Sequence, residues 1–394
     1  MRPPPIYLDH AATTPVRPEV VAAMAPFFGP RFGNPSSAHR WGREARAALD
    51  EARERVAGCL GAGADEVCFV SCGTEGDNLA VLGTWRAARV AAPDGGPART
   101  AIVTTPIEHK AVLAAVHQAA REGAEERLLA VDANGVVDRA SFDALVRDDV
   151  AVCSIMWVNN EIGTVQPIPE LAAAAKVRGV PFHTDAVQAF GKIAIDARTQ
   201  PFDTLTLSGH KIGAPKGIGA FYVRRGTPLE PLMHGGSQDR GLRPGTENVA
   251  MAVGLARAAE LAVAEREEEC ARLARLRDAL EAELLARIPD AVVHGRGGPR
   301  APHVLNISVP GTDSESLLLA LDLAGVAASS GSACQTGSVT PSHVLTAIGV
   351  PPELASAAVR MSLGALTTDE CVRRVSELFP ALIGKARRLA GATS

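Results

Sequence analysis

The sequence is poor in aromatic residues, which make up only 4% of its 394 positions. Alanine, valine and leucine must therefore supply most of the packing. Charge of one sign is not concentrated anywhere, since the formal net charge is -4 and no long basic run occurs. A nucleic-acid or anionic-membrane partner is therefore not expected, and the substrate should be a small molecule.

The sequence also lacks an apolar run long enough to span a membrane, and its start, MRPPPIYLDH, lacks the apolar core of a signal peptide. We therefore expect a cytoplasmic protein. The 7 cysteines are scattered and include no C-x-x-C pair. An odd, scattered set argues against a disulfide framework or a structural zinc site, and it leaves room for one reactive thiol.

Short β-branched runs alternate with alanine-rich stretches along the first two thirds of the chain. We predict buried strands at residues 66–71, 100–105, 151–158, 180–186 and 203–208, with helices between them, for example at 109–123 and 168–179. Apolar strands that alternate with helices predict a mostly parallel α/β sheet covered on both faces. Ligands of such sheets bind beyond the carboxyl ends of the strands, so the residues after each strand are the candidates for a site.

The last third of the chain has a different pattern. From about Val249 to Ile288, helical spacing predicts one long helix or a kinked pair. Its predicted core positions are Leu273, Leu276, Leu280 and Leu284. A Gly/Pro-rich turn follows, and the strand HVLNISV then opens a second, α+β unit. We place a domain boundary near residue 260.

The first strand end, SCGTEGDN, combines Gly73 and Thr74 at the predicted start of a helix. Gly73 allows the backbone to approach a ligand closely, and Thr74 adds a hydroxyl donor beside free amides, which suits a phosphate. The motif is neither a Walker A loop nor a G-x-G-x-x-G fingerprint. A Thr74 that simply caps the helix is a comparably good interpretation.

The next strand ends carry His109, the pair Asn159 and Asn160, and Asp185 with Gln188. A lone histidine is more often structural than catalytic, and an asparagine pair is equally compatible with a turn. Asp185 is the stronger candidate, because a buried carboxylate is costly unless it meets a cation.

The stretch SGHKIGAPKGIG, residues 208–219, places His210 and Lys211 after a further strand. In isolation, a lysine kept free for covalent chemistry and a basic loop that happens to contain Lys211 and Lys216 are about equally good interpretations. Together with the phosphate loop and Asp185, Lys211 matches what pyridoxal phosphate requires. A lysine holds that cofactor as a Schiff base, and an aspartate keeps its pyridine nitrogen protonated.

Two features of the last third complete the set of candidates. Cys334 lies in ASSGSACQTGSVTPSHVL, where small residues predict an exposed loop, whereas structural cysteines are usually buried. A linker with an incidental thiol is the alternative. Arg360 lies among apolar residues, where a guanidinium needs a buried anion. A substrate carboxylate would serve, and a structural salt bridge is the competing interpretation.

The motifs of the chain, taken in order, resemble those of the cysteine desulfurases, pyridoxal-phosphate enzymes that take sulfur from cysteine. They are YLDHAATTP, FGNPSSAH, TEGDNLA, EHKAVL, VNNEIG, HTDAVQ, SGHKIGAPKGIGA, HGG with RPGTEN, SSGSAC and VRMSLG. The resemblance spans almost the whole chain. SSGSAC resembles the subgroup with a long catalytic loop that feeds iron–sulfur cluster assembly and tRNA thiolation.

This resemblance implies the architecture of a fold-type I pyridoxal-phosphate enzyme. The large cofactor-binding domain, with a mostly parallel sheet of seven strands covered by helices, would comprise residues 15–260. Residues 1–14 and 261–394 would form a smaller α+β domain, which carries the catalytic-cysteine loop at about 328–342.

The resemblance also implies roles for the residues around the cofactor ring. Lys211 resembles the Schiff-base lysine that also moves the α-proton, and Cys334 resembles the nucleophile. Asp185 and Gln188 resemble the partners of the pyridine nitrogen and the phenolic oxygen. His109 resembles the histidine that stacks on the ring and also serves as an acid or base.

Further matches concern the phosphate and the substrate. Thr246 resembles a phosphate ligand donated by the other subunit, which implies a homodimer with shared sites. Asn160, which also resembles a cofactor-binding residue, and Arg360 resemble the residues that hold the substrate carboxylate. The residues that resemble the remaining phosphate binders are Gly73, Thr74, Ser208 and His210.

A desulfurase of this kind converts L-cysteine to L-alanine and leaves the sulfur on Cys334 as a persulfide. Acceptors such as an iron–sulfur scaffold protein would then receive it. No resident metal is expected, and the resemblance leaves open a transient role of Cys334 as a cluster ligand. Two residues depart from the family pattern. Cys72, beside the phosphate loop where the family usually has a small residue, would be an unplanned second thiol, and Gln335, after the nucleophile, bears on partner choice more than on chemistry.

Two rival functions remain. One is another pyridoxal-phosphate enzyme of this fold, such as an aminotransferase or a selenocysteine lyase, and the presence of Cys334 argues against the aminotransferase. The other is a catalytically silent scaffold for assembly partners, which would be expected to have lost Lys211 or Cys334.

Overall fold

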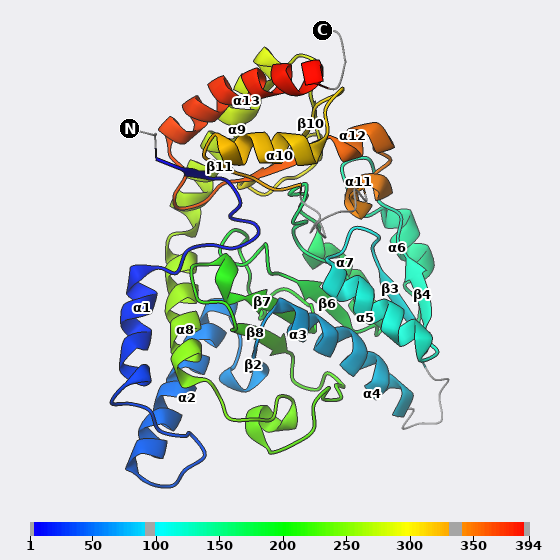
Figure 1. The fold of residues 1–394 in the computed structure, drawn as a ribbon. Helices are drawn as coiled ribbons and strands as arrows, with labels where there is room; N and C mark the ends of the chain where they lie inside the picture. Colours follow the sequence, from blue (N-terminus) through cyan, green and yellow to red (C-terminus); the bar gives the residue numbers. More distant parts are fainter. Residues whose placement is uncertain (1–3, 91–98, 331–340, 390–394) are drawn as a thin grey trace.

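The computed structural model describes residues 4–90, 99–330 and 341–389, and its larger unit is built on one seven-stranded sheet (Figure 1). The strand order is β2 (Val67–Val70), β8 (Gly219–Val223), β7 (Thr204–Ser208), β6 (Phe182–Asp185), β5 (Val150–Ser154), β3 (Ala101–Thr104), β4 (Glu125–Leu128). β8 pairs antiparallel with β2 and β7, and the other neighbours are parallel. The predicted mostly parallel α/β sheet is confirmed.

Both faces of this sheet are covered by helices, because successive strand residues point to opposite sides. In β3, Ala101 and Val103 join the core on the side of α2, α7 and α8, whereas Ile102 joins the core on the side of α4 and α5. The helices of this unit are α1 (Pro18–Met24), α2 (Arg40–Leu60), α3 (Gly73–Asn78), α4 (Thr84–Val90), α5 (Lys110–Arg121), α6 (Arg139–Leu145), α7 (Ile168–Val177) and α8 (Val249–Ala264).

The predicted strands lie where expected, with one wrong boundary. The run at 151–158 was expected to be strand throughout, but β5 ends at Ser154. On the β6 side the N–H groups of Ile155 and Trp157 still donate to β6 carbonyls, but on the other side the N–H of Met156 donates to the buried carboxylate of Glu108, at 3.0 Å from each oxygen. The prediction missed β4 and β8. In β4, Glu125–Leu128 includes two glutamates and an arginine and offers no apolar run.

The smaller unit stacks beside the sheet and contains the chain's other strands (Figure 1). A three-stranded antiparallel sheet has the order β12 (Ala358–Ser362), β10 (Val304–Ser308), β9 (Val292–Val293), and β1 (Ile6–Tyr7) pairs parallel with β11 (Val326–Ala327). Its helices are α9 (Arg266–Arg287), α10 (Ser314–Leu323), α11 (His343–Ala347), α12 (Pro352–Ser356) and α13 (Asp369–Leu389).

The stretch from Val249 to Ile288, predicted as one long helix or a kinked pair, is a pair of helices. α8 ends at Ala264 and α9 begins at Arg266, so α8 packs on the large sheet while α9 belongs to a second core. The four predicted core leucines of α9 are all buried in that second core. The N-terminal segment reaches the same core through Ile6 and Leu8. Within the described residues, no helix is both long and apolar enough to cross a membrane.

Candidate active site

A cavity of about 310 Å³ lies beyond the carboxyl ends of the parallel strands. Its wall contains ten of the residues proposed from the sequence, which come from segments far apart in the chain. They are Gly73, Thr74, His109, Asn160, Asp185, Gln188, Ser208, His210, Lys211 and Arg360. The sheet brings them together because parallel strands end at one edge.

Lys211 is held in this cavity by the N-terminal segment. It closes a short 3₁₀ turn, η4 (Gly209–Lys211), directly after β7. Its Nζ donates to the backbone carbonyls of Ala11 and Ala12, at 2.6 and 2.7 Å. Burial, helped by the charge of Arg360, lowers the pKa of this amine to about 8. The lowered pKa makes the neutral, nucleophilic form of this amine more accessible near neutral pH than it is for an exposed lysine.

Asp185 is the last residue of β6 and is buried in the same cavity. Its carboxylate accepts a hydrogen bond from the Val187 backbone N–H at 2.8 Å. Burial raises the pKa of Asp185, and His109 and Lys211 oppose this only partly. The protein's own cationic groups therefore do not fully compensate the burial of this carboxylate. A protonated ring nitrogen of a ligand would supply the missing positive charge.

His109 both caps a helix and lines the cavity. It precedes α5, and its Nδ1 accepts the backbone N–H of Ala111 at 3.2 Å, so the side chain caps the helix. Burial lowers the pKa of His109, which favours the neutral ring. Because Nδ1 accepts, the ring proton of the neutral form is on Nε2. The structural role of His109 is therefore confirmed, and the residue also lines the cavity.

The phosphate side of the cavity is formed by the start of α3 and the end of β7. A Cβ added to Gly73 would lie 2.9 Å from the Val187 Cγ2, so only glycine fits there without a shift. Cys72, with extended backbone, precedes the first helical residue, and Thr74 lies inside the first turn. The interpretation of Thr74 as a helix cap is therefore wrong. The buried Ser208 Oγ has no hydrogen-bond partner among the described residues.

His210 stands beside this group on the loop that carries Lys211. Its Nδ1 is 3.2 Å from the Thr13 hydroxyl, and its backbone carbonyl accepts the N–H of Thr14 at 2.8 Å. Burial lowers the pKa of His210 to about 4, so the imidazole is neutral at physiological pH.

Of the asparagine pair, Asn159 has the turn-forming role and Asn160 lies at the site. The buried Asn159 Oδ1 accepts the backbone N–H groups of Glu161 and Ile162, at 2.9 and 3.0 Å, and so builds a turn. Asn160 lies in the cavity wall. Its backbone carbonyl accepts a hydrogen bond from Arg360 Nη1 at 2.9 Å.

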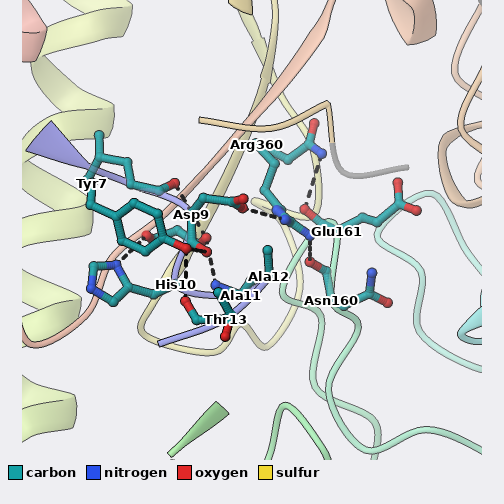
Figure 2. A network of polar contacts seen from close by, with 12 residues as sticks. Tyr7, Asp9, His10, Ala11, Ala12, Thr13, Asn160, Glu161 and Arg360 are labelled. Carbon is teal, nitrogen blue, oxygen red and sulfur yellow. Dashed lines mark hydrogen bonds and ion pairs between the residues drawn. The ribbon is translucent and has the colours of Figure 1, made fainter. Parts of the chain in front are cut away.

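Arg360 connects the C-terminal unit to the N-terminal segment (Figure 2). Its Nη2 donates to Asp9 Oδ1 at 2.7 Å, so the structural salt bridge is present. The buried Nε has no hydrogen-bond partner among the described residues, which leaves one directed donor for an anion. The Tyr7 hydroxyl donates to the carbonyls of Asp9 and Thr13 and fixes the turn that presents Asp9.

Sequence reasoning missed several residues of this wall, among them Asp77, Glu161 and His343. Asp77 is buried, and its Oδ1 has no hydrogen-bond partner in the described part of the chain. Burial, together with the charge of Asp185, raises the pKa of Asp77 well above its ordinary value. The only signal for Asp77 was its place in the motif TEGDNLA. The N-terminal motif YLDHAATTP likewise contained the residues that hold Lys211 and Arg360.

Two proposed site residues are not among those that the structure shows in this wall. Thr246 is exposed and does not line the cavity of its own chain. Cys334 and Gln335 lie outside the described residues.

Comparison with known families defines the class of this site. A family model described as aminotransferase class-V matches residues 6–375, so the chain belongs to the class-V aminotransferase family, whose members are pyridoxal-phosphate enzymes of fold type I.

Close relatives are cysteine desulfurases, and the chain belongs with them. The cysteine desulfurase IscS of Dictyoglomus turgidum is 45% identical over 384 residues, which cover 98% of this chain and 96% of the relative. The cysteine desulfurase NifS of Azotobacter vinelandii is 46% identical over 385 residues, covering 98% and 94%. A solved NifS-like protein superposes with a TM-score of 0.89 at 35% identity, covering 97% of this chain and 100% of the other.

The residues of the cavity fit pyridoxal phosphate. Lys211 offers an amine with a lowered pKa, and Asp185 offers a buried carboxylate that lacks a full cationic partner. The unpartnered Ser208 Oγ, which lies next to Gly73 at the start of α3, suits a phosphate group. All four line one cavity.

Proposed function

We propose that this protein converts L-cysteine to L-alanine and transfers the substrate sulfur to Cys334 as a persulfide. The observation that carries the proposal is the Lys211 amine, which lines one cavity with Asp185 and His109 and makes no ion pair with a carboxylate among the described residues. An amine of this kind serves both as the covalent anchor of the cofactor and as a base.

The chain's own residues provide binding and proton transfer. Bound pyridoxal phosphate supplies an electron sink for the substrate α-carbon. Arg360 Nε and Asn160 orient the substrate carboxylate, and the neutral amine of Lys211 takes the α-proton. Asp185 would hold the protonated ring nitrogen of the cofactor, and His109 would help to hold the ring and to transfer protons.

The sulfur step requires a thiolate. Cys334 Sγ forms a bond to the substrate sulfur as the carbon–sulfur bond breaks, and the electron pair of that bond remains with the substrate carbon. Proton uptake at that carbon, together with return of a proton to the α-carbon by Lys211, completes alanine. The persulfide on Cys334 then passes to acceptor proteins such as an iron–sulfur scaffold or components of tRNA thiolation. A cytoplasmic location, the division into residues 15–260 and the remainder, and a homodimer in which Thr246 reaches the neighbouring phosphate belong to the same proposal.

The reaction is tested with purified holoenzyme and L-cysteine. We expect sulfide, released in the presence of a thiol reductant, and alanine in equal amounts. L-selenocysteine and a 2-oxo acid with an amino donor serve as comparison substrates. Amino transfer without sulfide would identify an aminotransferase, and activity confined to selenocysteine would identify a selenocysteine lyase. Either result would overturn the proposal.

A further inference from the structure

His343 lies in the wall of the cavity that contains Lys211, and the proposed function gives it no role. It is the first residue of α11, and its ring Nε2 is 2.9 Å from the backbone carbonyl oxygen of Glu108. A carbonyl oxygen only accepts, so Nε2 carries a proton and donates it to this hydrogen bond. In the neutral ring, Nδ1 is then a hydrogen-bond acceptor.

This acceptor is accessible. The His343 side chain is only partly buried, and its Nδ1 makes no hydrogen bond within the described residues. Nδ1 is also not one of the unpartnered side-chain atoms that the described part of the chain closes off from solvent. Because the same side chain lines the cavity, the lone pair of Nδ1 is available to a molecule that enters it.

The two imidazoles of His109 and His343 offer opposite hydrogen-bonding groups. His109 Nδ1 already accepts the backbone N–H of Ala111, so its neutral ring has a donor at Nε2. His343 has its donor occupied by the Glu108 carbonyl and keeps an acceptor. A bound group that can only donate, such as a neutral thiol beside a ring nitrogen, is therefore suited to His343 and not to His109.

Direct contacts join His343 to the residues proposed to hold the substrate carboxylate. Arg360 Nη1 donates to the backbone carbonyl of Asn160 at 2.9 Å (Figure 2). The next residue, Glu161, accepts a hydrogen bond from the Ser342 hydroxyl at 2.5 Å. Ser342 directly precedes His343. The wall therefore continues from Arg360 through Glu161 to His343, and all three line the cavity.

The position of His343 is fixed from both of its neighbouring segments. The Ser342 hydroxyl donates to Glu161 and accepts the backbone N–H of Leu345 at 3.2 Å, which fixes the start of α11. Ser342 and Glu161 are both buried. The contact from Nε2 to the Glu108 carbonyl holds the ring itself. A side chain held in this way keeps its free nitrogen in one direction, as a substrate-orienting group requires.

We propose that His343 orients the substrate, and that its Nδ1 accepts a hydrogen bond from the thiol of L-cysteine. The proposal rests on the proposed function and deepens it. An amino acid whose carboxylate is held by Arg360 and Asn160 lies along the wall that leads to His343. A residue that accepts from the thiol favours cysteine over an amino acid that lacks the donor. Alanine lacks it, so the contact is lost once the sulfur has been transferred.

The test compares the binding of L-cysteine and of L-alanine to the holoenzyme, followed by the absorbance of the cofactor. The parent protein is Cys334→Ser, in which sulfur transfer should not interfere with the titration. Adding His343→Leu should weaken the binding of L-cysteine about three- to tenfold, because one hydrogen bond is lost, and leave that of L-alanine within about twofold. Adding His117→Leu, at an exposed histidine of α5, is the matched control and should change neither.

Two further variants separate the acceptor from the fold. His343→Asn places an amide oxygen near the position of Nδ1 and should restore most of the preference for L-cysteine. His343→Gln keeps a donor for the Glu108 carbonyl without an acceptor at the position of Nδ1, so it should lose the preference as His343→Leu does. If His343→Leu does not fold, the comparison of His343→Asn with His343→Gln decides.

Equal weakening of both amino acids by His343→Leu would show a general packing role and overturn the proposal, as would unchanged binding of both. Equal preferences in His343→Asn and His343→Gln would overturn it as well. Failure of the proposed function would be seen separately, because the wild-type holoenzyme would then release no sulfide from L-cysteine, whichever amino acid it binds more tightly.

Discussion

Lys211 and Lys192 are two half-buried lysines whose amines have the same lowered pKa in different surroundings. Burial lowers the pKa of each amine to about 8. Lys211 lies in a cavity with Asp185 and His109, whereas Lys192 lines a second cavity, of about 530 Å³, whose wall also contains two buried histidines. A lowered lysine pKa therefore reports removal from water. The neighbouring groups, and not the pKa alone, decide whether the amine suits covalent chemistry.

The two cavities also differ in how their polar atoms are satisfied. In the first, the Lys211 amine is fixed by two carbonyls of the N-terminal segment. In the second, the Cys270 thiol donates to the carbonyl of Lys192 at 3.4 Å, and the Lys192 amine is left without a partner in the described chain. Burial raises the pKa of Cys270, so this thiol is a poor nucleophile near neutral pH.

The largest expected effect separates the two lysines by function. Lys211→Ala should lower cysteine turnover by about 10⁴-fold, because both the covalent anchor and the base are lost. Sulfide release measures the loss of turnover. The amount of cofactor that stays covalently attached after borohydride reduction measures the loss of the anchor. Lys216→Ala, an exposed lysine on the same loop, is the matched control and should stay active. An active Lys211→Ala would refute the assignment.

The next effect distinguishes the thiols. Cys334→Ser should reduce sulfide release by about 10³-fold or more, since a hydroxyl is far less ionised than a thiol and a poor acceptor of sulfur. The variant should still bind the cofactor and change its spectrum when cysteine is added.

Two conservative variants serve as controls for Cys334. Cys72→Ser alters the first cavity and Cys270→Ser the second, and both should retain most of the sulfide release. Mass spectrometry after a cysteine pulse should find the added sulfur on Cys334. A persulfide confined to Cys72 would move the nucleophile to the phosphate side of the first cavity.

A smaller effect tests whether a neighbouring subunit contributes a residue to the first cavity. Thr246 is exposed and outside the cavity of its own chain. If it reaches the neighbouring subunit's phosphate, Thr246→Ala should weaken cofactor retention about tenfold, the value of one hydrogen bond to a charged group. Dialysis measures the retention, and light scattering should give a dimer. A fully active monomer would exclude the shared site.

The smallest effect tests whether the two lysines sense each other. The cofactor aldehyde reacts with a neutral amine, so the rate of cofactor incorporation into the cofactor-free protein should rise from pH 7 and level off above about pH 8. The charges of Arg360 and Lys192 lower the pKa of Lys211, and those of Asp185 and Asp9 raise it.

Lys192→Met removes one of the lowering charges. The pKa of Lys211 should then rise, and the midpoint of the rate profile should move to higher pH by a fraction of a unit. Stopped-flow absorbance across pH 6.5 to about 9.5 resolves such a shift. An unchanged midpoint would show that the two cavities are electrostatically separate.

The sequence alone determined the elements and most of the residue types of the site. Alternation of apolar strands with helices was enough for the sheet, because strand and helix periodicities are local properties. The residues at strand ends were recognisable, because parallel strands bring their carboxyl ends to one edge. Lys211 and Asp185 were found in this way. Local chemistry by itself left the roles of the other site residues open. Those roles were inferred from the order of the motifs along the chain.

Only the tertiary structure decided which alternatives hold. Arg360 has its salt bridge because Asp9, 351 residues away in the chain, is folded back onto β12. His109 both caps α5 and lines the cavity, and Asn159 builds the turn that leaves Asn160 in the wall. The second cavity had no motif at all. His10 comes from the N-terminal segment, Lys192 from the β6–β7 connection and His303 from the residue before β10, and only long-range packing brings them into the wall of one cavity.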